Sequence, residues 1–264
     1  MRLAALLFIL ALAAPAHAET LFTMPSVPDV TDGDGWTVAL GAGVEYESEY
    51  DGSDDYGTEF EPGLVVQWRR GNHMGFLEGQ ELGWRARMAD AWLVQAGLRY
   101  EMGREESEAP ELDGMGDVDD ELVVMGEVRR ALGDWDNWVA GRIMTGGSDI
   151  GTLGVVALGH TFTMGAPGMG IDLFAFATFA SSEFINRDFG VTPEQAANTG
   201  YPVTDLDSGY RSVGLSLVGR WRFGSRWQLQ AEAGYEKYNG DIGDSPLALQ
   251  DYESELGVSL YYRF

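Results

Sequence analysis

The chain has 264 residues, of which 42 are Asp or Glu and 17 are Lys or Arg, so its formal net charge is −25. This acidity excludes a nucleic-acid-binding protein, because contact with the phosphate backbone needs clustered Lys and Arg. The absence of Cys excludes disulfides and thiolate sites. The length fits a single domain, and the 36 glycines suit short, turning strands.

The first residues have the pattern of an export signal. Arg2 precedes an apolar run from Leu3 to Ala14, and Ala16-His17-Ala18 forms an A-x-A cleavage site. The run is shorter than the about 20 residues that a membrane-spanning helix needs. We therefore predict a cleaved signal peptide over residues 1–18. Residues 19–35 contain Pro, Asp and Thr and predict a loose periplasmic lead-in.

From residue 36 onward, apolar and polar residues alternate, as they do in strands with one lipid-facing side. In segment 92–102 the even-numbered residues are apolar or aromatic, and segments 36–46 and 227–238 repeat the scheme. Each is long enough to cross a bilayer as a tilted strand, for which about 9–11 residues suffice. We predict about twelve strands: 36–46, 60–69, 73–79, 82–88, 92–102, 121–131, 138–145, 152–162, 170–180, 210–223, 227–238 and 251–264.

The last strand runs to the terminal aromatic residue Phe264, with Leu256, Val258, Leu260 and Tyr262 on the same face. This ending is typical of outer-membrane barrels of Gram-negative bacteria. Together with the signal peptide it predicts an all-β, antiparallel, up-and-down transmembrane barrel over residues 36–264. Segment 170–180 is ambiguous, because Phe174 and Phe176 compete with Ile171, Leu173 and Phe179 for the lipid-facing side.

The lengths of the connections predict the orientation. If the first strand starts in the periplasm, the four longest connections (47–59, 103–120, 181–209 and 239–250) fall outside and the periplasmic turns are short, as expected. These loops hold 21 of the 42 acidic residues, against Arg104 and Arg187. They could bind divalent cations or share them with lipopolysaccharide phosphates. A solvated acidic surface is the favoured alternative, since no EF-hand spacing is present.

The same loops carry a family resemblance. Tyr50, Gly52, Ser53 and Tyr56 follow the first strand in a Y-x-G-S-x-x-Y pattern, and Phe189-Gly190-Val191-Thr192-Pro193-Glu194-Gln195 lies in the longest loop. With the closing Tyr262-Arg263-Phe264, these motifs resemble the MipA/OmpV family over essentially the whole mature chain. The resemblance implies an outer-membrane barrel. It also implies a scaffold that links a lytic transglycosylase to a murein synthase, although other members are described as osmoregulated or antigenic.

The motif in the longest loop also predicts a helix over 193–199. Thr192 is a good N-cap, Pro193 fits the first helical position, and Gln195 completes a capping box. Glu194 faces the positive end of the helix dipole. Gly200 then offers a C-terminal stop. Such a helix over the barrel mouth could be a plug, a lid or a partner surface, or it could simply protect the strand ends.

Catalysis is not predicted. The mature chain has only His73 and His160, and no Ser lies at a recognised offset from either. No Gly-rich nucleotide loop, HExxH motif or other metal-ligand array is present. We therefore predict a protein that is not an enzyme and has no cofactor.

Two functions stay open. A scaffold for murein enzymes would use the lead-in and the predicted periplasmic turn 132–137, where Asp134, Trp135 and Asp136 offer a partner surface. A narrow pore would prefer cations, because its lining would be rich in carboxylates. The alternative for this lining is a self-bridged interior without conduction. The predicted lining residues are Glu45, Gln95, Arg99, Glu101, Gln228, Gln230, Glu232 and Glu236.

Overall fold

The computed structural model describes residues 33–89, 91–147, 150–164 and 168–264. The predicted signal peptide and residues 19–32 of the lead-in lie outside these ranges. Among the described residues, no helix has both the length and the apolar character to cross a membrane.

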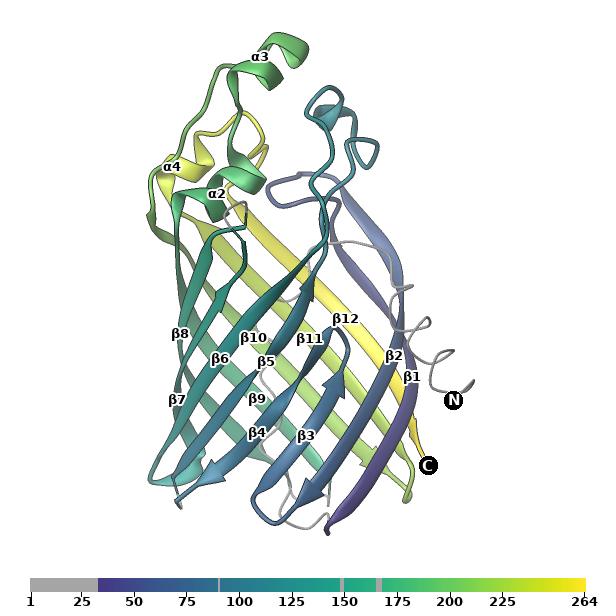
Figure 1. Cartoon of the computed structure of the whole chain (residues 1–264). Coiled ribbons are helices and arrows are strands. Elements are labelled where there is room, and N and C mark those ends of the chain that lie inside the picture. Colours follow the sequence, from purple (N-terminus) through teal and green to yellow (C-terminus); the bar gives the residue numbers. More distant parts are fainter. Residues whose placement is uncertain (1–32, 90, 148–149, 165–167) are drawn as a thin grey trace.

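Twelve antiparallel strands form a closed barrel in which each strand pairs with its neighbours in sequence and β1 pairs with β12 (Figure 1). The predicted barrel and all twelve predicted strands are confirmed, including the short pair at 73–88. The strands are β1 (Gly35–Ser48), β2 (Tyr56–Arg70), β3 (His73–Glu78), β4 (Glu81–Met88), β5 (Trp92–Glu101), β6 (Glu121–Leu132), β7 (Asp134–Thr145), β8 (Thr152–Thr163), β9 (Met169–Ala180), β10 (Gly209–Phe223), β11 (Trp227–Tyr238) and β12 (Tyr252–Arg263).

One predicted turn is wrong. The sequence suggests a connection over 132–137, but β6 continues to Leu132 and β7 begins at Asp134. Gly133 alone separates the two strands, with φ of 89°. Glycine adopts this left-handed conformation without steric cost, so the chain reverses direction within fewer residues than the sequence suggests.

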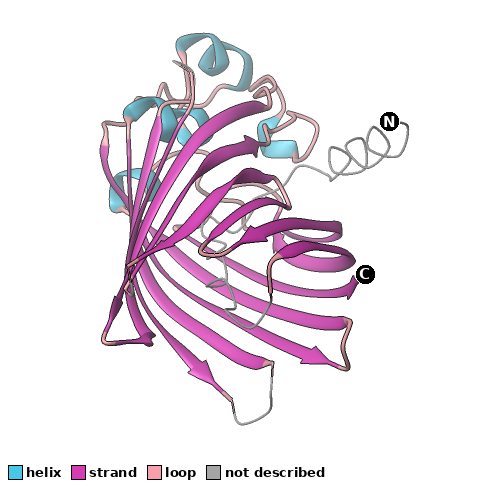
Figure 2. Ribbon diagram, turned by 60° about the horizontal axis from the view of Figure 1, so that its bottom comes forward, coloured by secondary structure: helices cyan, strands magenta, loops and turns pink. Residues whose placement is uncertain are grey.

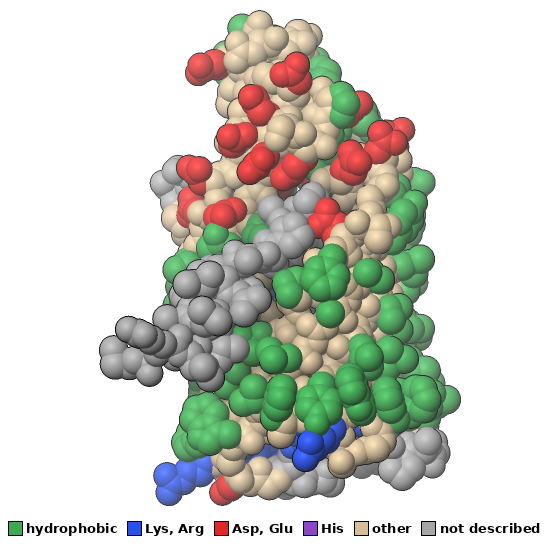
Figure 3. Space-filling view, turned by 90° about the vertical axis from the view of Figure 1, so that its right-hand side faces the viewer, with side chains coloured by type: hydrophobic (Ala, Val, Ile, Leu, Met, Phe, Trp, Pro, Cys, Tyr) green, Lys and Arg blue, Asp and Glu red, His purple; other side chains and the backbone are tan. Residues whose placement is uncertain are grey.

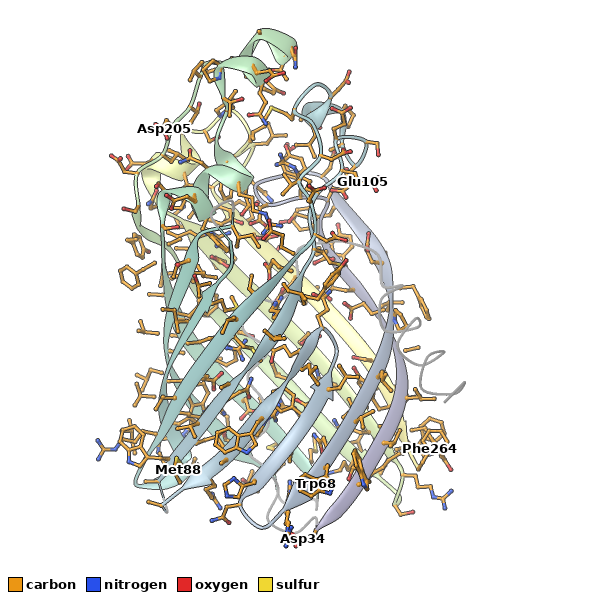
Figure 4. All side chains as sticks on the ribbon, in the orientation of Figure 1. Asp34, Trp68, Met88, Glu105, Asp205 and Phe264 are labelled. Atoms are coloured by element: carbon orange, nitrogen blue, oxygen red, sulfur yellow. The ribbon has the colours of Figure 1, made fainter. Side chains whose placement is uncertain are left out.

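Side-chain alternation separates a lipid-facing wall from a polar lumen. Exposed apolar side chains surround the barrel, with acidic groups at the helix-bearing end and Lys or Arg at the opposite end (Figure 3). Trp68 and Phe264 lie toward the short-turn end, whereas Glu105 and Asp205 lie at the other (Figure 4). The ambiguity in β9 is also resolved. Phe174 and Phe176 point inward and are 1% and 8% exposed, while Leu173 and Phe179 are 40% and 48% exposed.

All helices of the described residues gather at one end of the barrel, and the opposite end has only short turns (Figure 2). The predicted helix is confirmed as α3 (Pro193–Thr199), with the Thr192 and Gln195 capping box in place. The sequence analysis did not predict α2 (Ser182–Phe189), α4 (Gly240–Gly243) or the 3₁₀ turn η1 (Pro110–Leu112). Long loops at one end identify that end as external.

Candidate functional site: the lumen and the loop cap

Four long connections pack together over the external end of the barrel. We call residues 49–55, 102–120, 181–208 and 239–251 the loop cap. Its buried apolar core contains Tyr50, Ala109, Leu112, Met115, Val191 and Leu247, so every one of the four connections contributes. The cap is therefore a small folded unit with an apolar core of its own, built on the barrel.

Hydrogen bonds across the connections hold the cap together. Gln195 Nε2 donates to the Met115 carbonyl at 2.8 Å, and Ser245 Oγ donates to the Phe189 carbonyl at 2.6 Å. Gln250 Nε2 donates both to the Ser53 carbonyl at 2.6 Å and to the Tyr56 hydroxyl at 2.9 Å. The family-motif residues thus lie at the contacts between loops.

Gly52 shows why one motif position needs glycine. Its φ is 92°, and a Cβ there would lie 3.0 Å from both the Phe189 ring and the Ala248 backbone. A larger residue would push the first loop away from α2 and from the fourth loop. Gly190 is similarly enclosed, because a Cβ there would lie 2.6 Å from the Asn186 carbonyl oxygen.

Helix α2 covers part of the lumen from above. Ser181 caps its N-terminus, and Phe184, Ile185 and Phe189 are buried against the inward-facing apolar residues of the barrel. The Phe189 ring meets the Tyr238 ring edge-on, with 5.0 Å between centroids. The sequence analysis missed α2 because eight residues are too few to show a clear helical periodicity. The N-cap serine Ser181 was the one signal that could have indicated the start of this helix.

Arg211 connects the cap to the lumen. Its guanidinium donates to Glu236 Oε1 at 2.6 Å and to Asp51 Oδ2 at 2.7 Å, and its Cζ lies 5.0 Å from the Tyr238 ring centroid. The side chain is 1% exposed. This residue, which the sequence analysis missed, links β10, β11 and the first loop in one buried contact.

Asp188, in the last turn of α2, lies near this cluster and is partly buried. Burial raises the pKa of Asp188 to about 6, with a further contribution from the nearby Asp51 carboxylate. Arg104 Nη1 donates to the Asp188 backbone carbonyl at 3.2 Å. The cap therefore contains a carboxyl that titrates at mildly acidic pH.

One side of the lumen is bridged by ion pairs. Arg142 binds Glu81 Oε1 and Glu127 Oε2, both at 2.9 Å, and Arg129 contacts Glu127 Oε1 at 3.3 Å. Arg99 donates to Glu101 Oε2 at 3.0 Å. The contact between Arg142 and Glu81 joins β7 to β4, which are not neighbours in the sheet. This network fixes the interior of β4 to β7 as a rigid polar core.

The other side is a carboxylate wall formed by β1, β2, β11 and β12. Glu45 lies opposite Glu59 on β2 and opposite Gly257 on β12. A Cβ on Gly257 would lie 2.8 Å from Glu232 Oε1, so this glycine leaves room for that carboxylate. Within the described part of the chain, Glu45 Oε1 and Glu47 Oε2 are buried without a hydrogen-bond partner. The wall also contains Glu61, Glu253 and Glu255.

The structure places the predicted lining residues on these two sides. Glu45, Gln95, Arg99 and Glu236 are buried within the barrel, and Glu101 is paired with Arg99. Gln228, Gln230 and Glu232 follow one another on the inward parity of β11 and are partly exposed. The predicted lining residues are separate from the predicted partner surface. Asp134, Trp135 and Asp136 of that surface begin β7 at the short-turn end. His160 Nδ1 lies 2.9 Å from Asn137 Oδ1, and His73 stacks on Trp84.

A pocket lies below the cap. Asp51 and Asp188 line it from the cap, Arg99 and Glu101 from the ion-paired side, and Glu253 and Glu255 from the carboxylate wall. No group of three or more His, Cys, Asp or Glu side chains suited to a metal ion occurs in the described ranges. The chemistry that the cavity offers is thus binding of polar or positively charged groups.

Solved structures of outer-membrane proteins are similar to the chain at low sequence identity. The CymD monoaromatic hydrocarbon channel is 10% identical, with a TM-score of 0.43 and 88% of each chain covered. The KdgM porin is 10% identical, with a TM-score of 0.44, 86% of this chain covered and 99% of the porin. An outer membrane channel from Pseudomonas putida F1 is 10% identical, with a TM-score of 0.45, 92% of this chain covered and all 100% of the channel.

No curated protein matches the chain by sequence. A family model does match, over residues 40–264, which is all but the N-terminal part of the chain. That family is described as MltA-interacting protein MipA. The resemblance found in the loop motifs is therefore confirmed: this outer-membrane β-barrel belongs to the MipA family.

Proposed function

We propose that this protein is a non-catalytic outer-membrane scaffold for murein-synthesising and murein-hydrolysing enzymes. The observation that carries the proposal is the family match over residues 40–264, because the family is described by its interaction with another protein, MltA. The ion-paired interior and the packed loop cap support this role. Both make the barrel a rigid body suited to anchoring partners at the membrane.

In this proposal the partners bind at the short-turn end, which faces the periplasm. Asp134, Trp135 and Asp136 begin β7 there, and the lead-in 19–35 precedes β1. A lytic transglycosylase and a murein synthase are the expected partners. No nucleic acid is expected, given the acidic composition.

The test is site-specific photocrosslinking in cells. A photoreactive amino acid at position 135 or at Asp29 should capture murein enzymes, whereas the same group at Glu105 in the loop cap should not. Capture of only lipid and other barrels from positions 135 and 29 would contradict the scaffold. Equal capture of the enzymes from Glu105 would also contradict it, because that residue lies at the external end.

A second candidate, a narrow pore with cation preference, is favoured by the carboxylate wall. Glu47 and Glu255 project into the lumen without an ion pair among the described contacts, and acidic rings favour cations in channels. Purified barrel in planar bilayers would then give discrete steps with a cation-selective reversal potential. The double change Glu47→Gln and Glu255→Gln should reduce that selectivity, and Glu105→Gln should not. Absence of steady conductance would contradict the pore, and the scaffold would then be the one proposed function that remains.

A further inference from the structure

The hairpin of β3 and β4 is too short to cross the membrane. The two strands have 6 and 8 residues, whereas every other strand has at least 10. A six-residue strand extends about 20 Å along its own axis. At the usual tilt of about 40° it rises roughly 15 Å, against an apolar band of about 25 Å. The hairpin is therefore expected to end within the apolar band, and Figure 1 shows that it ends below the top of β2.

Of the two strands beside the hairpin, β2 extends well beyond it, whereas β5 ends at Glu101, one residue after the Tyr100 N–H donates to the Gln80 carbonyl at 3.0 Å. β2 pairs with β3 only from Val65 to Arg70, and the last contact is from the Gly79 N–H to the Leu64 carbonyl at 3.3 Å. Above that point, Tyr56 to Gly63 pair only with β1 in the described part of the structure. On the other side of this region lie the end of β5 and the base of the second loop, where Arg104 pairs with Val118. The barrel wall thus has a gap in its external half.

The free edge of β2 is suited to remain without a partner strand. Since the Leu64 carbonyl points toward β3, the backbone groups of Tyr56, Thr58, Phe60 and Pro62 point into the gap by alternation. Pro62 has no N–H to offer, and proline on an edge strand discourages pairing with another strand. The remaining backbone groups need polar partners, because hydrocarbon alone cannot satisfy them. Water or a polar head group fits the gap better than a strand.

The gap adjoins the interior cavities. Gln80 at the tip of the hairpin, Arg99 and Glu101 line the pocket below the cap. A second hollow is lined by Glu47, Thr58 and Glu59, together with Glu108 of the loop cap. The hairpin tip and the free part of β2 thus each adjoin polar space in the upper part of the barrel.

The charges around the gap determine the charge of the head group that can bind there. Glu47, Glu59 and Glu61 belong to the carboxylate wall on one flank, while Arg99 on the other flank is already paired with Glu101 and Glu81. An anionic head group would be repelled by the wall. We propose that the gap is a lateral opening through which a single-chain amphiphile with a cationic head enters from the outer leaflet. The head lies against the carboxylate wall, and the alkyl chain stays in lipid beside the free edge of β2. This inference is independent of the scaffold role.

The test uses the full barrel reconstituted in vesicles with a trace of a long-chain primary amine that carries a diazirine in its alkyl chain. After irradiation, mass spectrometry should find label on inward-facing residues at the gap, such as Glu61 and Gln80. Gln230, which is inward-facing on the closed wall, is the matched control position and should carry none. Label confined to outward-facing residues around the whole barrel would overturn the opening.

Charge preference is tested by two further comparisons. The change Glu59→Gln with Glu61→Gln should reduce labelling at Gln80 about fivefold, the effect expected when partly screened charge pairs are lost. Glu105→Gln should leave labelling unchanged, and retention of heat-modifiable gel mobility shows that each variant is folded. Equal labelling at Gln80 by a probe with the same chain and a sulfate head would overturn the cationic class of ligand.

Discussion

Arg211 is a single side chain on which several elements depend. It neutralises Glu236 in the lumen and Asp51 in the first loop, and its guanidinium lies over the Tyr238 ring. A buried ion pair adds little to the stability of the fold compared with an apolar replacement. Removal of one partner, however, leaves the other charge buried and uncompensated. Loss of Arg211 would therefore leave the Glu236 charge buried without its partner and would weaken the attachment of the loop cap to the barrel.

We expect Arg211→Gln to lower the free energy of unfolding by about 3–5 kcal/mol, because Glu236 is left without its cation. Urea unfolding of the barrel in lipid vesicles, followed by Trp fluorescence, measures the change. The matched control is Arg226→Gln, since Arg226 is exposed and donates only to the Tyr262 hydroxyl in the described contacts. A loss for Arg211→Gln no larger than that of the control would contradict the role assigned to Arg211.

Asp188 makes the cap sensitive to pH. Burial raises its pKa to about 6 in the folded protein, above the ordinary value of 3.8, so the folded state binds the proton more tightly than the unfolded state. Its contribution to stability is therefore largest below pH 4 and is lost as the pH rises through about 6. The cap should be more firmly closed in acid.

The corresponding measurement is hydrogen exchange of the α2 amides at pH values from 4 to 8, corrected for intrinsic exchange rates. Protection in the wild-type protein should fall across this range. In Asp188→Asn the amide cannot ionise, so protection should change less and should exceed that of the wild type at pH 8. Identical pH profiles for the two proteins would show that another group controls the cap.

At the scale of elements, the strands were predictable because each must satisfy one local rule. Alternation over about 10 residues exposes one apolar face to lipid, and segments 92–102 and 227–236 show it. Helix α3 was predictable because Thr192, Pro193 and Gln195 form a complete local signal. The extent of β7 was not, because the sequence does not reveal that Gly133 alone makes the turn.

The lumen contacts were less predictable. Inward parity marks Glu127 and Arg142 as lumen residues, but the pairing of Arg142 with Glu81 joins strands that are three apart in the sheet. That contact depends on the closure and the width of the barrel, which no local pattern encodes. In the same way, Phe174 and Phe176 face inward because α2 and Trp138 provide an apolar environment inside.

The contact between β7 and β8 offers a test of this interior packing. Gly159 lies against the Trp138 ring, and a Cβ at this position would overlap the ring atoms. Overpacking of this kind costs about 1–3 kcal/mol, so Gly159→Ala should lower the free energy of unfolding by that amount. Gly154→Ala on the same strand is the control, because its Cβ would lie 3.7 Å from the Phe179 carbonyl oxygen, an ordinary contact. Equal stability of the two variants would contradict the inward packing of Trp138.

At the scale of the whole molecule, stability depends on ring closure. β12 pairs with β11 on one side and with β1 on the other, and the Phe264 N–H donates to the Val38 carbonyl at 3.0 Å. An open sheet in lipid would leave two edges of backbone groups without partners. The barrel is therefore expected to be stable in lipid only when the ring of strands is closed.

We expect a chain that ends at Gln250 to lose the heat-dependent gel shift of a folded barrel, because removal of β12 leaves β1 and β11 without their partner. A chain that lacks only Phe264 should keep the shift after refolding into detergent micelles, since it loses one backbone hydrogen bond of the ladder. Persistence of the shift in the chain ending at Gln250 would show that a smaller barrel can close.

The shared core of the loop cap has a consequence for recognition of the cell surface. Tyr50, Leu112, Val191 and Leu247 come from four separate connections and are buried against one another, so part of each loop is hidden from the medium. An antibody raised against one loop as a peptide would encounter apolar side chains that the intact protein conceals. Epitopes on this protein should therefore be composite, and sequence variation that escapes immunity should concentrate at the exposed acidic positions between the buried anchors.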